Sequence, residues 1–329
     1  MSTPLRIAII GAGGIAHAHA RAYTAQGGGV CQLVGYADIK LAQAEGMARE
    51  YGGRAYTDAA RMLDELHPDA VSVCTPPTFH AQYAGMALER SIPVLCEKPM
   101  TADAASARAL AAQSRRLGVL LMPGHCHRFH GPAQALKELI AAGKLGRVLQ
   151  FENRFAGRLE GVVNTWFTRK DVAGAGMLLD TGVHSLDLFR YLVGEVTWVC
   201  AQTLAAEATE VEDTGAILLR SIDGVIGGIS FSWMTPPGEW TVRLYGSAGT
   251  AVLDYGVDGG ALRYWTKDSG DWVQLPNPGP DRFVNEVAHF LQCVRTDAQP
   301  RVTAEDGARA IEIIDACDRS VESGCGVAV

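Results

Sequence analysis

The chain has 329 residues, of which 48% are hydrophobic and 20% are charged, and its formal net charge is -7. This length corresponds to about two domains, and the composition excludes a disordered or low-complexity chain. The negative charge argues against nonspecific binding to nucleic acid or to an anionic membrane. The first apolar run, Leu5–Ile10, is too short for a secretion signal, and no run reaches the roughly 18 apolar residues of a membrane span. We therefore expect neither nucleic acid nor a membrane as a partner.

The eight cysteines are scattered along the chain, and none forms a C-x-x-C pair. Most of them lie inside apolar runs, as buried reduced thiols do. A chain of this length can bury a stable core without disulfides, which are rare in reducing compartments. We therefore expect a cytoplasmic protein with reduced cysteines.

The first third of the chain alternates short β-branched runs with alanine-rich stretches of helical spacing. This alternation predicts a parallel sheet covered by helices on both faces, as in the doubly wound Rossmann fold. Strands are expected at Leu5–Ile10, Gln32–Ala37, Ala70–Cys74, Pro93–Cys96 and Val119–Met122, and helices at Ile15–Gln26, Lys40–Tyr51, Asp58–Leu66, Thr78–Arg90 and Ala102–Leu117.

The pattern changes near Pro123, and we place the boundary there between a domain at residues 1–123 and one at residues 124–329. In the second domain most strands follow one another across tight turns, which predicts an open, mostly antiparallel sheet. The predicted fold class is therefore α/β, with two different sheets. Strands are expected at Arg147–Arg154, Val196–Thr203, Ala216–Arg220, Val225–Trp233, Thr241–Tyr245, Thr250–Asp254 and Leu262–Trp265, and helices at Pro132–Ala142, Leu179–Leu192, Asp281–Arg295 and Thr303–Ser323.

A glycine-rich turn follows the first predicted strand directly. Residues 11–16 read GAGGIA, which is the G-x-G-x-x-A form of the dinucleotide-binding turn. Gly11 permits the tight turn, Gly13 lets the backbone approach a pyrophosphate, and Gly14 and Ile15 open a helix whose N-terminus attracts phosphate. Because the pattern stands between a strand and a helix, it predicts a cofactor site rather than an ordinary turn.

The second predicted strand ends at Asp38. A carboxylate at this position accepts hydrogen bonds from the adenosine ribose hydroxyls and repels a 2′-phosphate. Ile39 follows it, which favours NAD over NADP. Lys40 stands two residues after Asp38 and is compatible with NADP as well.

Two further strands end in residues that can carry chemistry, because ligands of an open parallel sheet bind beyond the carboxyl ends of its strands. Thr75, Pro76 and His80 follow the fourth strand, and we expect them to contact the cofactor. Glu97 and Lys98 follow the fifth strand. Near a nicotinamide, Lys98 can stabilise negative charge on a substrate oxygen; otherwise it is a surface lysine paired with Glu97. A cis bond between Lys98 and Pro99 would aim this lysine at the crevice.

A second group of candidates stands on a predicted helix after a glycine-rich stretch. Asp180 and His184 are four residues apart, so their side chains share one helix face. A carboxylate beside an imidazole orients it and favours its protonation, which suits a base that takes a hydroxyl proton. The alternative is a buried histidine satisfied by its helix neighbour. Trp166, in the preceding loop, is a candidate substrate contact.

Histidines and a cysteine gather between residues 125 and 130. His125 and His127 have the spacing of a strand, and Cys126 and His130 stand beside them. No neighbouring carboxylate or second cysteine completes a zinc site. We therefore expect no metal here, and contact with cofactor or substrate instead.

These motifs resemble the Gfo/Idh/MocA oxidoreductases, a family that includes inositol 2-dehydrogenase and glucose–fructose oxidoreductase. The resemblance covers nearly the whole chain. It is carried by GAGGIAHAH, CTPPTFH, CEKPM, GHCHRF, GAGMLLDTGVHSLDLFRYLVG, LYGSAGTAVLD, FVNEVAHFLQCV and DGARAIEIIDACDRS. The sequence departs from the family at residues 75–77, where Thr-Pro-Pro replaces the commoner Thr-Pro-Asn.

The resemblance implies a role for each matching residue. Lys98 would orient the substrate oxygen, His184 would be the general acid and base, and Asp180 would pair with it and bind a neighbouring hydroxyl. His80 and Glu97 would lie near the nicotinamide. Arg128 would stand at the mouth of the substrate pocket. The second domain would bind substrate and use its open sheet in a homodimer or homotetramer.

We therefore expect an enzyme that transfers hydride between NAD, or NADP, and a secondary alcohol or ketone of a sugar, inositol or related polyol. One alternative is a glycosidase that uses NAD for a transient oxidation. Another is a non-catalytic dinucleotide-binding regulator of the same fold. The presence of Lys98, Asp180 and His184 together favours the dehydrogenase.

Overall fold

The computed structural model describes residues 3–158, 162, 165–206, 210–256, 260–275 and 279–329. The chain forms two compact units. Unit 1 comprises Met1–Cys126 and Arg282–Arg309, and unit 2 comprises His127–Asp281 and Ala310–Val329. Each unit is described separately below.

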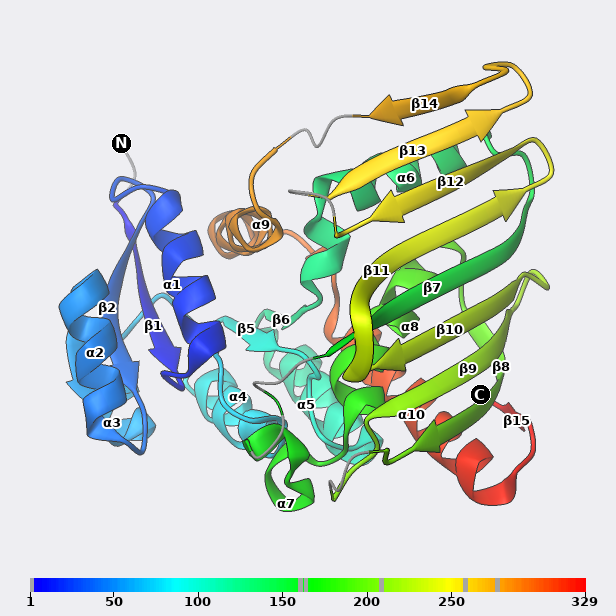
Figure 1. Ribbon diagram of the computed structural model, residues 1–329. Coiled ribbons are helices and arrows are strands. Elements are labelled where there is room, and N and C mark those ends of the chain that lie inside the picture. Colours follow the sequence, from blue (N-terminus) through cyan, green and yellow to red (C-terminus); the bar gives the residue numbers. More distant parts are fainter. Residues whose placement is uncertain (1–2, 159–161, 163–164, 207–209, 257–259, 276–278) are drawn as a thin grey trace. The chain divides into compact units, whose positions relative to one another are not determined.

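Unit 1 is built on a parallel sheet of six strands (Figure 1, blue to cyan). The strands run in the order β3-β2-β1-β4-β5-β6. The order reverses between β1 and β4, and crevices at such switch points bind ligands in open α/β sheets. The strands are β1 (Leu5–Ile10), β2 (Cys31–Ala37), β3 (Arg54–Tyr56), β4 (Ala70–Val73), β5 (Val94–Glu97) and β6 (Leu121–Gly124).

The strands of unit 1 are connected by five helices, and a sixth comes from the distant segment of the chain. This sixth helix, α9 (Arg282–Thr296), packs on α1. The Gln26 side chain donates to the Val284 carbonyl at 3.0 Å, and Arg295 donates to the Val30 carbonyl at 2.7 Å. The connecting helices are α1 (Gly14–Ala25), α2 (Leu41–Tyr51), α3 (Ala59–Leu66), α4 (His80–Glu89) and α5 (Ala104–Leu117).

Unit 2 is built on a mixed sheet of nine strands in the order β14-β13-β12-β11-β7-β10-β9-β8-β15. Among the strand pairs that the structure describes in this sheet, only the central β7–β10 pair is parallel. The strands are β7 (Val148–Arg158), β8 (Val196–Leu204), β9 (Thr214–Ser221), β10 (Ile226–Ser232), β11 (Met234–Gly246), β12 (Gly249–Asp254), β13 (Ala261–Thr266), β14 (Trp272–Leu275) and β15 (Val327–Ala328).

Helices cover one face of this sheet. α6 (Gly131–Ala141) packs on β12 and β13, and α8 (Val183–Leu192) packs on β7. The rings of Phe151 on β7 and Phe189 on α8 meet edge to face with centroids 5.2 Å apart. α10 (Ala304–Ser323) continues into this unit, where Ser320 accepts a hydrogen bond from Ala201 at 2.9 Å. The remaining helical segment of note is the short α7 (Lys170–Ala173).

The structure confirms the predicted fold class, a Rossmann sheet followed by a mostly antiparallel sheet. The strands β3, β14 and β15 were not predicted, because each is short and has no clear alternation of polar and apolar residues. The boundary expected at residue 123 lies near the end of the first segment of unit 1. Residues 282–309 differ from the expectation, since they belong to unit 1 rather than to the second domain. Among the described residues, no helix combines the length and hydropathy that crossing a membrane requires.

Candidate functional site

The turn after β1 has the backbone conformation that its glycines predict. Gly11 has φ +91°, and its N–H donates to the Ala37 carbonyl at 2.8 Å. A Cβ at Gly11 would stand 2.6 Å from the carbonyl carbon and oxygen of Cys74. Only glycine fits here, because both the conformation and the contact exclude a side chain. The turn is thereby pressed against the end of β4.

The other two glycines of the turn face open space. A Cβ at Gly13 or Gly14 would meet no atom within 4 Å. Gly13 is the N-cap of α1, and no side chain caps this helix. Ile15 lies in its first turn, and Ala16 is fully buried. The N–H groups of an uncapped helix start, beside open space, can bind a pyrophosphate.

Asp38 ties the end of β2 to this turn. One carboxylate oxygen accepts from the backbone N–H of Ala12 and the other from that of Lys40, both at 2.8 Å. Carboxylate oxygens accept more than one hydrogen bond, so the pair can still receive ribose hydroxyls. The next residue, Ile39, is 82% exposed and offers an apolar surface at the same place.

The segment after β4 presents an unsatisfied hydroxyl. The Oγ1 atom of Thr75 is buried and has no hydrogen-bond partner within the part of the chain that the structure describes. Pro76 precedes a 3-10 turn at Pro77–Phe79, and as a proline it has no backbone N–H to donate to a ligand. A buried hydroxyl without a partner is costly unless something binds it. A bound dinucleotide could supply that partner, so the residues of this unit fit such a cofactor.

His80 is buried and serves the protein itself. One ring nitrogen lies 2.7 Å from the Thr75 carbonyl and the other 2.8 Å from the Pro99 carbonyl. Carbonyl oxygens only accept, so the ring donates to both only when it is protonated. Burial lowers the pKa of His80 and opposes this protonation. His80 therefore links the ends of β4 and β5, and its predicted contact with the cofactor stays a prediction.

Glu97, Lys98 and Pro99 follow one another at the end of β5. The bond between Lys98 and Pro99 is cis, as expected. Glu97 is 4% exposed, and burial by itself raises the pKa of its carboxyl. The hydrogen bond and charge of His19, together with Lys98, outweigh burial and lower this pKa below its usual value. Glu97 therefore remains a carboxylate, and it accepts the backbone N–H of Lys98 at 3.0 Å.

In unit 2, the second group of candidates stands where a π-helical turn, η4 (Leu178–Gly182), leads into α8. Asp180 lies in this turn and His184 in the first turn of α8, and both are half-buried. The Oδ2 atom of Asp180 accepts from the Thr181 hydroxyl at 3.2 Å. Single π turns inside α-helices are frequent at functional sites. The predicted helix is thus confirmed, with a widened turn that the sequence did not indicate.

Gly176, in the glycine-rich stretch before this turn, packs closely against Glu212. A Cβ at Gly176 would collide with the backbone of Glu212. The Glu212 carboxylate accepts from the N–H groups of Gly176 and Leu178, both at 3.0 Å. This glycine therefore makes room for a carboxylate that caps the start of the helix.

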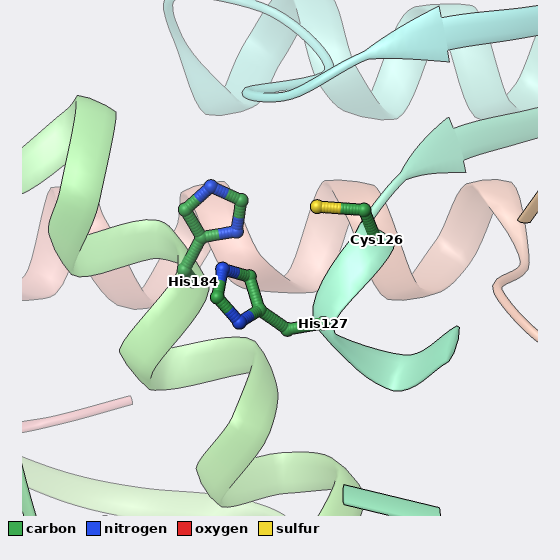
Figure 2. A group of neighbouring side chains, drawn as sticks. All are labelled: Cys126, His127 and His184. Atoms are coloured by element: carbon green, nitrogen blue, oxygen red, sulfur yellow. The ribbon is translucent and has the colours of Figure 1, made fainter. Parts of the chain in front are cut away.

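His184 contacts a second histidine. The ring of His127 meets it edge to face, with centroids 4.4 Å apart (Figure 2). His127 also lies edge to face on Tyr255 at 4.9 Å, and Tyr255 stacks on His130 at 4.6 Å. His127, Tyr255 and His130 thus form a row of contacting rings that are buried or half-buried, and the His127 ring covers one side of the His184 ring. His125 is buried as well, at 1% exposure.

Figure 2 also shows Cys126, the residue before His127. A thiol and two imidazoles are ligand types that zinc uses. Zinc needs the thiolate, however, and burial raises the pKa of the Cys126 thiol. The expectation that no metal binds here stays a prediction.

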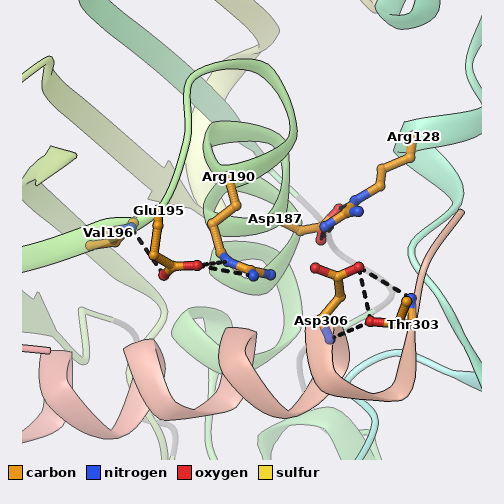
Figure 3. Close-up of polar contacts among 7 residues, drawn as sticks. All are labelled: Arg128, Asp187, Arg190, Glu195, Val196, Thr303 and Asp306. Carbon is orange, nitrogen blue, oxygen red and sulfur yellow. Dashed lines mark hydrogen bonds and ion pairs between the residues drawn. The ribbon is translucent and has the colours of Figure 1, made fainter. Parts of the chain in front are cut away.

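Arg128 forms a buried ion pair on α8. Its Nη2 and Nε atoms donate to the two oxygens of Asp187 at 2.7 and 2.9 Å (Figure 3), and both side chains are less than 10% exposed. Asp187 stands one helical turn after His184, so the pair holds the segment carrying His127 against α8. The structure gives Arg128 this anchoring contact, and its predicted substrate contact stays a prediction. Trp166, also predicted to contact substrate, is 38% exposed and stacks on Phe167 at 3.9 Å.

The candidates therefore form one cluster in each unit. Lys98 and the nucleotide turn belong to unit 1, whereas Asp180 and His184 belong to unit 2. Sequence reasoning missed His19, Asp187 and Glu212. His19 had a signal that could have revealed it, since it falls on the buried face of α1, among residues that are otherwise alanine or tyrosine.

Two models of one protein family match the chain. The model described as "Oxidoreductase family, NAD-binding Rossmann fold" matches residues 5–125. The model described as "GFO/IDH/MocA C-terminal domain" matches residues 133–252. Together they cover well over half of the chain.

Individual relatives agree with this match. D-glucoside 3-dehydrogenase of Escherichia coli (strain K12) is 39% identical over 197 residues, which are 59% of this chain and 55% of that protein. D-xylose 1-dehydrogenase (NADP(+)) 2 of Haloferax volcanii is 29% identical over 87% of this chain and 88% of its own length. The crystal structure of aldose-aldose oxidoreductase from Caulobacter crescentus, complexed with glycerol, superposes with a TM-score of 0.91 at 26% identity over 99% of this chain and 100% of that one.

Proposed function

Because the chain belongs to the GFO/IDH/MocA oxidoreductase family, we propose that it is an NAD(P)-dependent dehydrogenase or reductase acting on a secondary alcohol or ketone of a sugar, inositol or related polyol. The relatives above are named as dehydrogenases or oxidoreductases of sugars. Within this chain, the observation that carries the proposal is the placement of Glu97-Lys98-Pro99 at the end of β5, in the same unit as the dinucleotide turn.

NAD, when bound, supplies the carbon that accepts or donates hydride. Gly11, Gly13, Gly14 and Ile15 would hold its pyrophosphate through the start of α1, and Asp38 would hold the adenosine ribose. The orphaned hydroxyl of Thr75, with Pro76, would line the same crevice. Asp38 followed by an exposed Ile39 supports NAD as the preferred cofactor, because a 2′-phosphate would meet a carboxylate.

Three side chains would act on the substrate. Lys98 donates a hydrogen bond to the reacting oxygen and stabilises the negative charge that develops on it. His184 takes the hydroxyl proton when the alcohol is oxidised and returns it in the reverse direction. Asp180 orients this imidazole and favours its protonated form. Because it must accept the hydroxyl proton, His184 has to be neutral when an oxidation begins.

The two alternatives are less well supported. A glycosidase that uses NAD transiently and a regulator that only binds dinucleotide are both compatible with the fold. The named relatives carry out dehydrogenase or reductase chemistry, and this chain has a candidate for each part of that chemistry. A regulator would have no need of Lys98 and His184 together.

The test is a turnover assay with NAD and NADP on D-glucose, methyl β-D-glucoside, D-xylose and myo-inositol, read by nicotinamide absorbance. We expect at least one of these to be oxidised with NAD. Lys98→Ala and His184→Ala should lower kcat by about 10²- to 10⁴-fold while NAD binding stays nearly intact. Tight NAD binding without turnover, unaffected by either substitution, would favour the regulator instead.

We also propose that the protein is a cytoplasmic homo-oligomer. All eight cysteines are free thiols, which suits a reducing compartment. The uncovered face of the unit 2 sheet carries a shallow hollow lined by residues that include Glu152, Arg154, Glu239 and Arg243. Opposite charges on one patch allow it to pair with a second copy of itself across a two-fold axis.

A further inference from the structure

A buried chain of hydrogen bonds reaches Lys98 from within unit 1. Its members are Tyr23 and His19 on α1, Ser72 on β4 and Glu97 on β5, and none is more than 4% exposed. The Tyr23 hydroxyl lies 2.8 Å from that of Ser72, and Ser72 Oγ lies 3.1 Å from His19 Nδ1. His19 Nε2 lies 2.7 Å from Glu97 Oε1. Glu97 Oε2 then accepts the backbone N–H of Lys98.

The carboxylate end fixes the direction of the bond that reaches it. A carboxylate only accepts, so His19 Nε2 carries a proton and donates to Glu97. The Ser72 and Tyr23 hydroxyls can each donate and accept, so the other two bonds form whether His19 Nδ1 donates or accepts. Burial raises the pKa of Tyr23, which therefore keeps its proton. Every member has a partner within the network, and buried networks of this kind hold their members rigidly.

The residue after Lys98 is held as well. The Pro99 carbonyl lies 2.8 Å from Nδ1 of the buried His80. The backbone is thus held at the Lys98 N–H, through Glu97 and His19, and at the Pro99 carbonyl, by His80, whereas the Lys98 side chain itself is only half-buried. A long, flexible lysine gains precision when its backbone cannot shift, and catalytic groups need positions accurate to about 0.5 Å.

We propose that His19 is a positioning residue for Lys98, acting through the Glu97 carboxylate. This role rests on the proposed function, because it matters only if Lys98 contacts the substrate. His19 would touch neither substrate nor cofactor. Its Nε2–H would fix the carboxylate that in turn fixes the Lys98 main chain.

Two substitutions of the same chemistry separate this role from general stability. The amide nitrogen of a glutamine reaches the place of Nε2, whereas that of the shorter asparagine reaches only the place of Nδ1. We expect His19→Gln to keep kcat within about 3-fold of the parent. His19→Asn should lower kcat by about 10- to 100-fold, with the KM for NAD changed less than 2-fold. The substrate is the member of the above panel that is oxidised fastest.

The loss of kcat in His19→Asn should depend on the presence of the Lys98 side chain. In a Lys98→Ala background, His19→Gln and His19→Asn should therefore give equal kcat. A matched control is His17, two residues earlier on α1, which pairs with Glu50 at 3.4 Å but is only half-buried, with 35% of its side chain exposed. His17→Gln and His17→Asn should not differ in kcat. The proposal is wrong if the asparagine and glutamine variants of His19 have equal kcat when Lys98 is present, or if His19→Asn lowers kcat as much in the Lys98→Ala background as in the parent.

Two further measurements cover variants that fold poorly or panels without turnover. Ser72→Ala removes the bond that orients His19, together with the bond to the Tyr23 hydroxyl, and should lower kcat about 2- to 5-fold, again only when Lys98 is present. The chain has six lysines, so ¹³C-dimethyl-lysine spectra can resolve Lys98, assigned with Lys98→Arg. Its signal should move in His19→Asn and stay in His19→Gln; identical spectra would overturn the proposal without any activity. Failure of the proposed function is distinct, because Lys98→Ala would then leave kcat unchanged.

Discussion

Gly11 shows how little freedom a single residue of this site has. Its φ is +91°, and the Cys74 carbonyl occupies the place that a Cβ would need. The sequence pattern predicted a glycine here for a tight turn. The structure adds that the turn is closed against the end of β4, so the residue serves the contact between strands as well as the approach of a ligand.

Gly11→Ala should therefore destabilise the protein by about 1–3 kcal/mol and weaken NAD binding at least 10-fold. The reason is that the turn must move away from β4, and α1 must move with it. Thermal unfolding and NAD titration measure the two effects. Gly27→Ala is the matched control, because Gly27 has φ +84° but open space around it. It should cost about 1 kcal/mol and leave NAD binding unchanged. Equal NAD affinity in the two variants would contradict this account.

The sequence pattern predicted which residues stand at the site more reliably than it predicted what those residues contact. Asp38 and Lys98 stand at strand ends, as the alternation of strands and helices required. The partners of His80 and Gly176 could not be read from the sequence, because they come from segments 19 and 36 residues away. A histidine at a strand end can face a ligand or bridge two carbonyls, and only the packed structure decides between them.

At the scale of elements, a buried ion pair joins α8 to the segment after β6. The Nε and Nη2 atoms of Arg128 donate to both carboxylate oxygens of Asp187, and both side chains are buried. A second ion pair joins Arg190, on the same helix, to Glu195, which follows the helix (Figure 3). It has the same chemistry, but the Glu195 side chain is 38% exposed. The two pairs form a natural comparison of buried and exposed charges.

Asp187→Asn should lower the free energy of unfolding by about 3–5 kcal/mol, because it removes the charge of a carboxylate that is paired with a guanidinium out of contact with water. Glu195→Gln should lower it by at most about 1 kcal/mol. Chemical unfolding in urea measures both. The double variant Arg128→Met with Asp187→Leu removes both charges and should recover most of the loss. Equal losses for Asp187→Asn and Glu195→Gln would show that burial does not set the strength of this pair.

The helix that carries Asp180 and His184 was predicted from its apolar spacing, but its π-helical turn was not. Apolar periodicity reports which face of a helix is buried. It does not reveal a turn with one extra residue, because that residue shifts the spacing of apolar residues by less than this spacing varies among ordinary helices. The Glu212 carboxylate that holds the start of this helix lies more than 30 residues away in the sequence. Its contribution could not be read from the local pattern.

At the scale of the whole molecule, the uncovered sheet face of unit 2 should carry the contact between copies. Along β9, Ile217 and Leu219 are buried, whereas Leu218 faces outward at 49% exposure. Apolar residues that alternate onto an open sheet face favour an interface. This pattern and the mixed charges of the hollow support association through this face.

Leu218→Glu should therefore convert an oligomer into monomers without unfolding unit 2, since a charge in an apolar contact has no partner. Sedimentation velocity and circular dichroism measure the two properties. Ile222→Glu is the control, because Ile222 is 69% exposed in the turn after β9 and does not line the hollow. A parent protein that sediments as a monomer would show that there is no contact between copies. A Leu218→Glu variant that keeps the size of an oligomeric parent would show that the contact lies on another surface.

The division of the chain was the least predictable feature at this scale. The change of pattern near residue 123 was visible in the sequence, because strand spacing and connections differ on its two sides. The return of residues 282–309 to unit 1 was not visible, since α9 looks like any amphipathic helix. The sequence shows that such a helix has an apolar face, but not which sheet or helix will cover it.

The packing of α9 on α1 also orders events during synthesis. Unit 1 begins at the amino terminus, yet its last segment ends at Arg309. A growing polypeptide that has just released the nucleotide turn from the ribosome still lacks the helix that covers α1. The face of α1 beside Gln26 and Val30 therefore lacks its covering helix until almost all of unit 2 has been translated. The first unit to emerge is therefore among the last to be finished, and the two units mature together rather than one after the other.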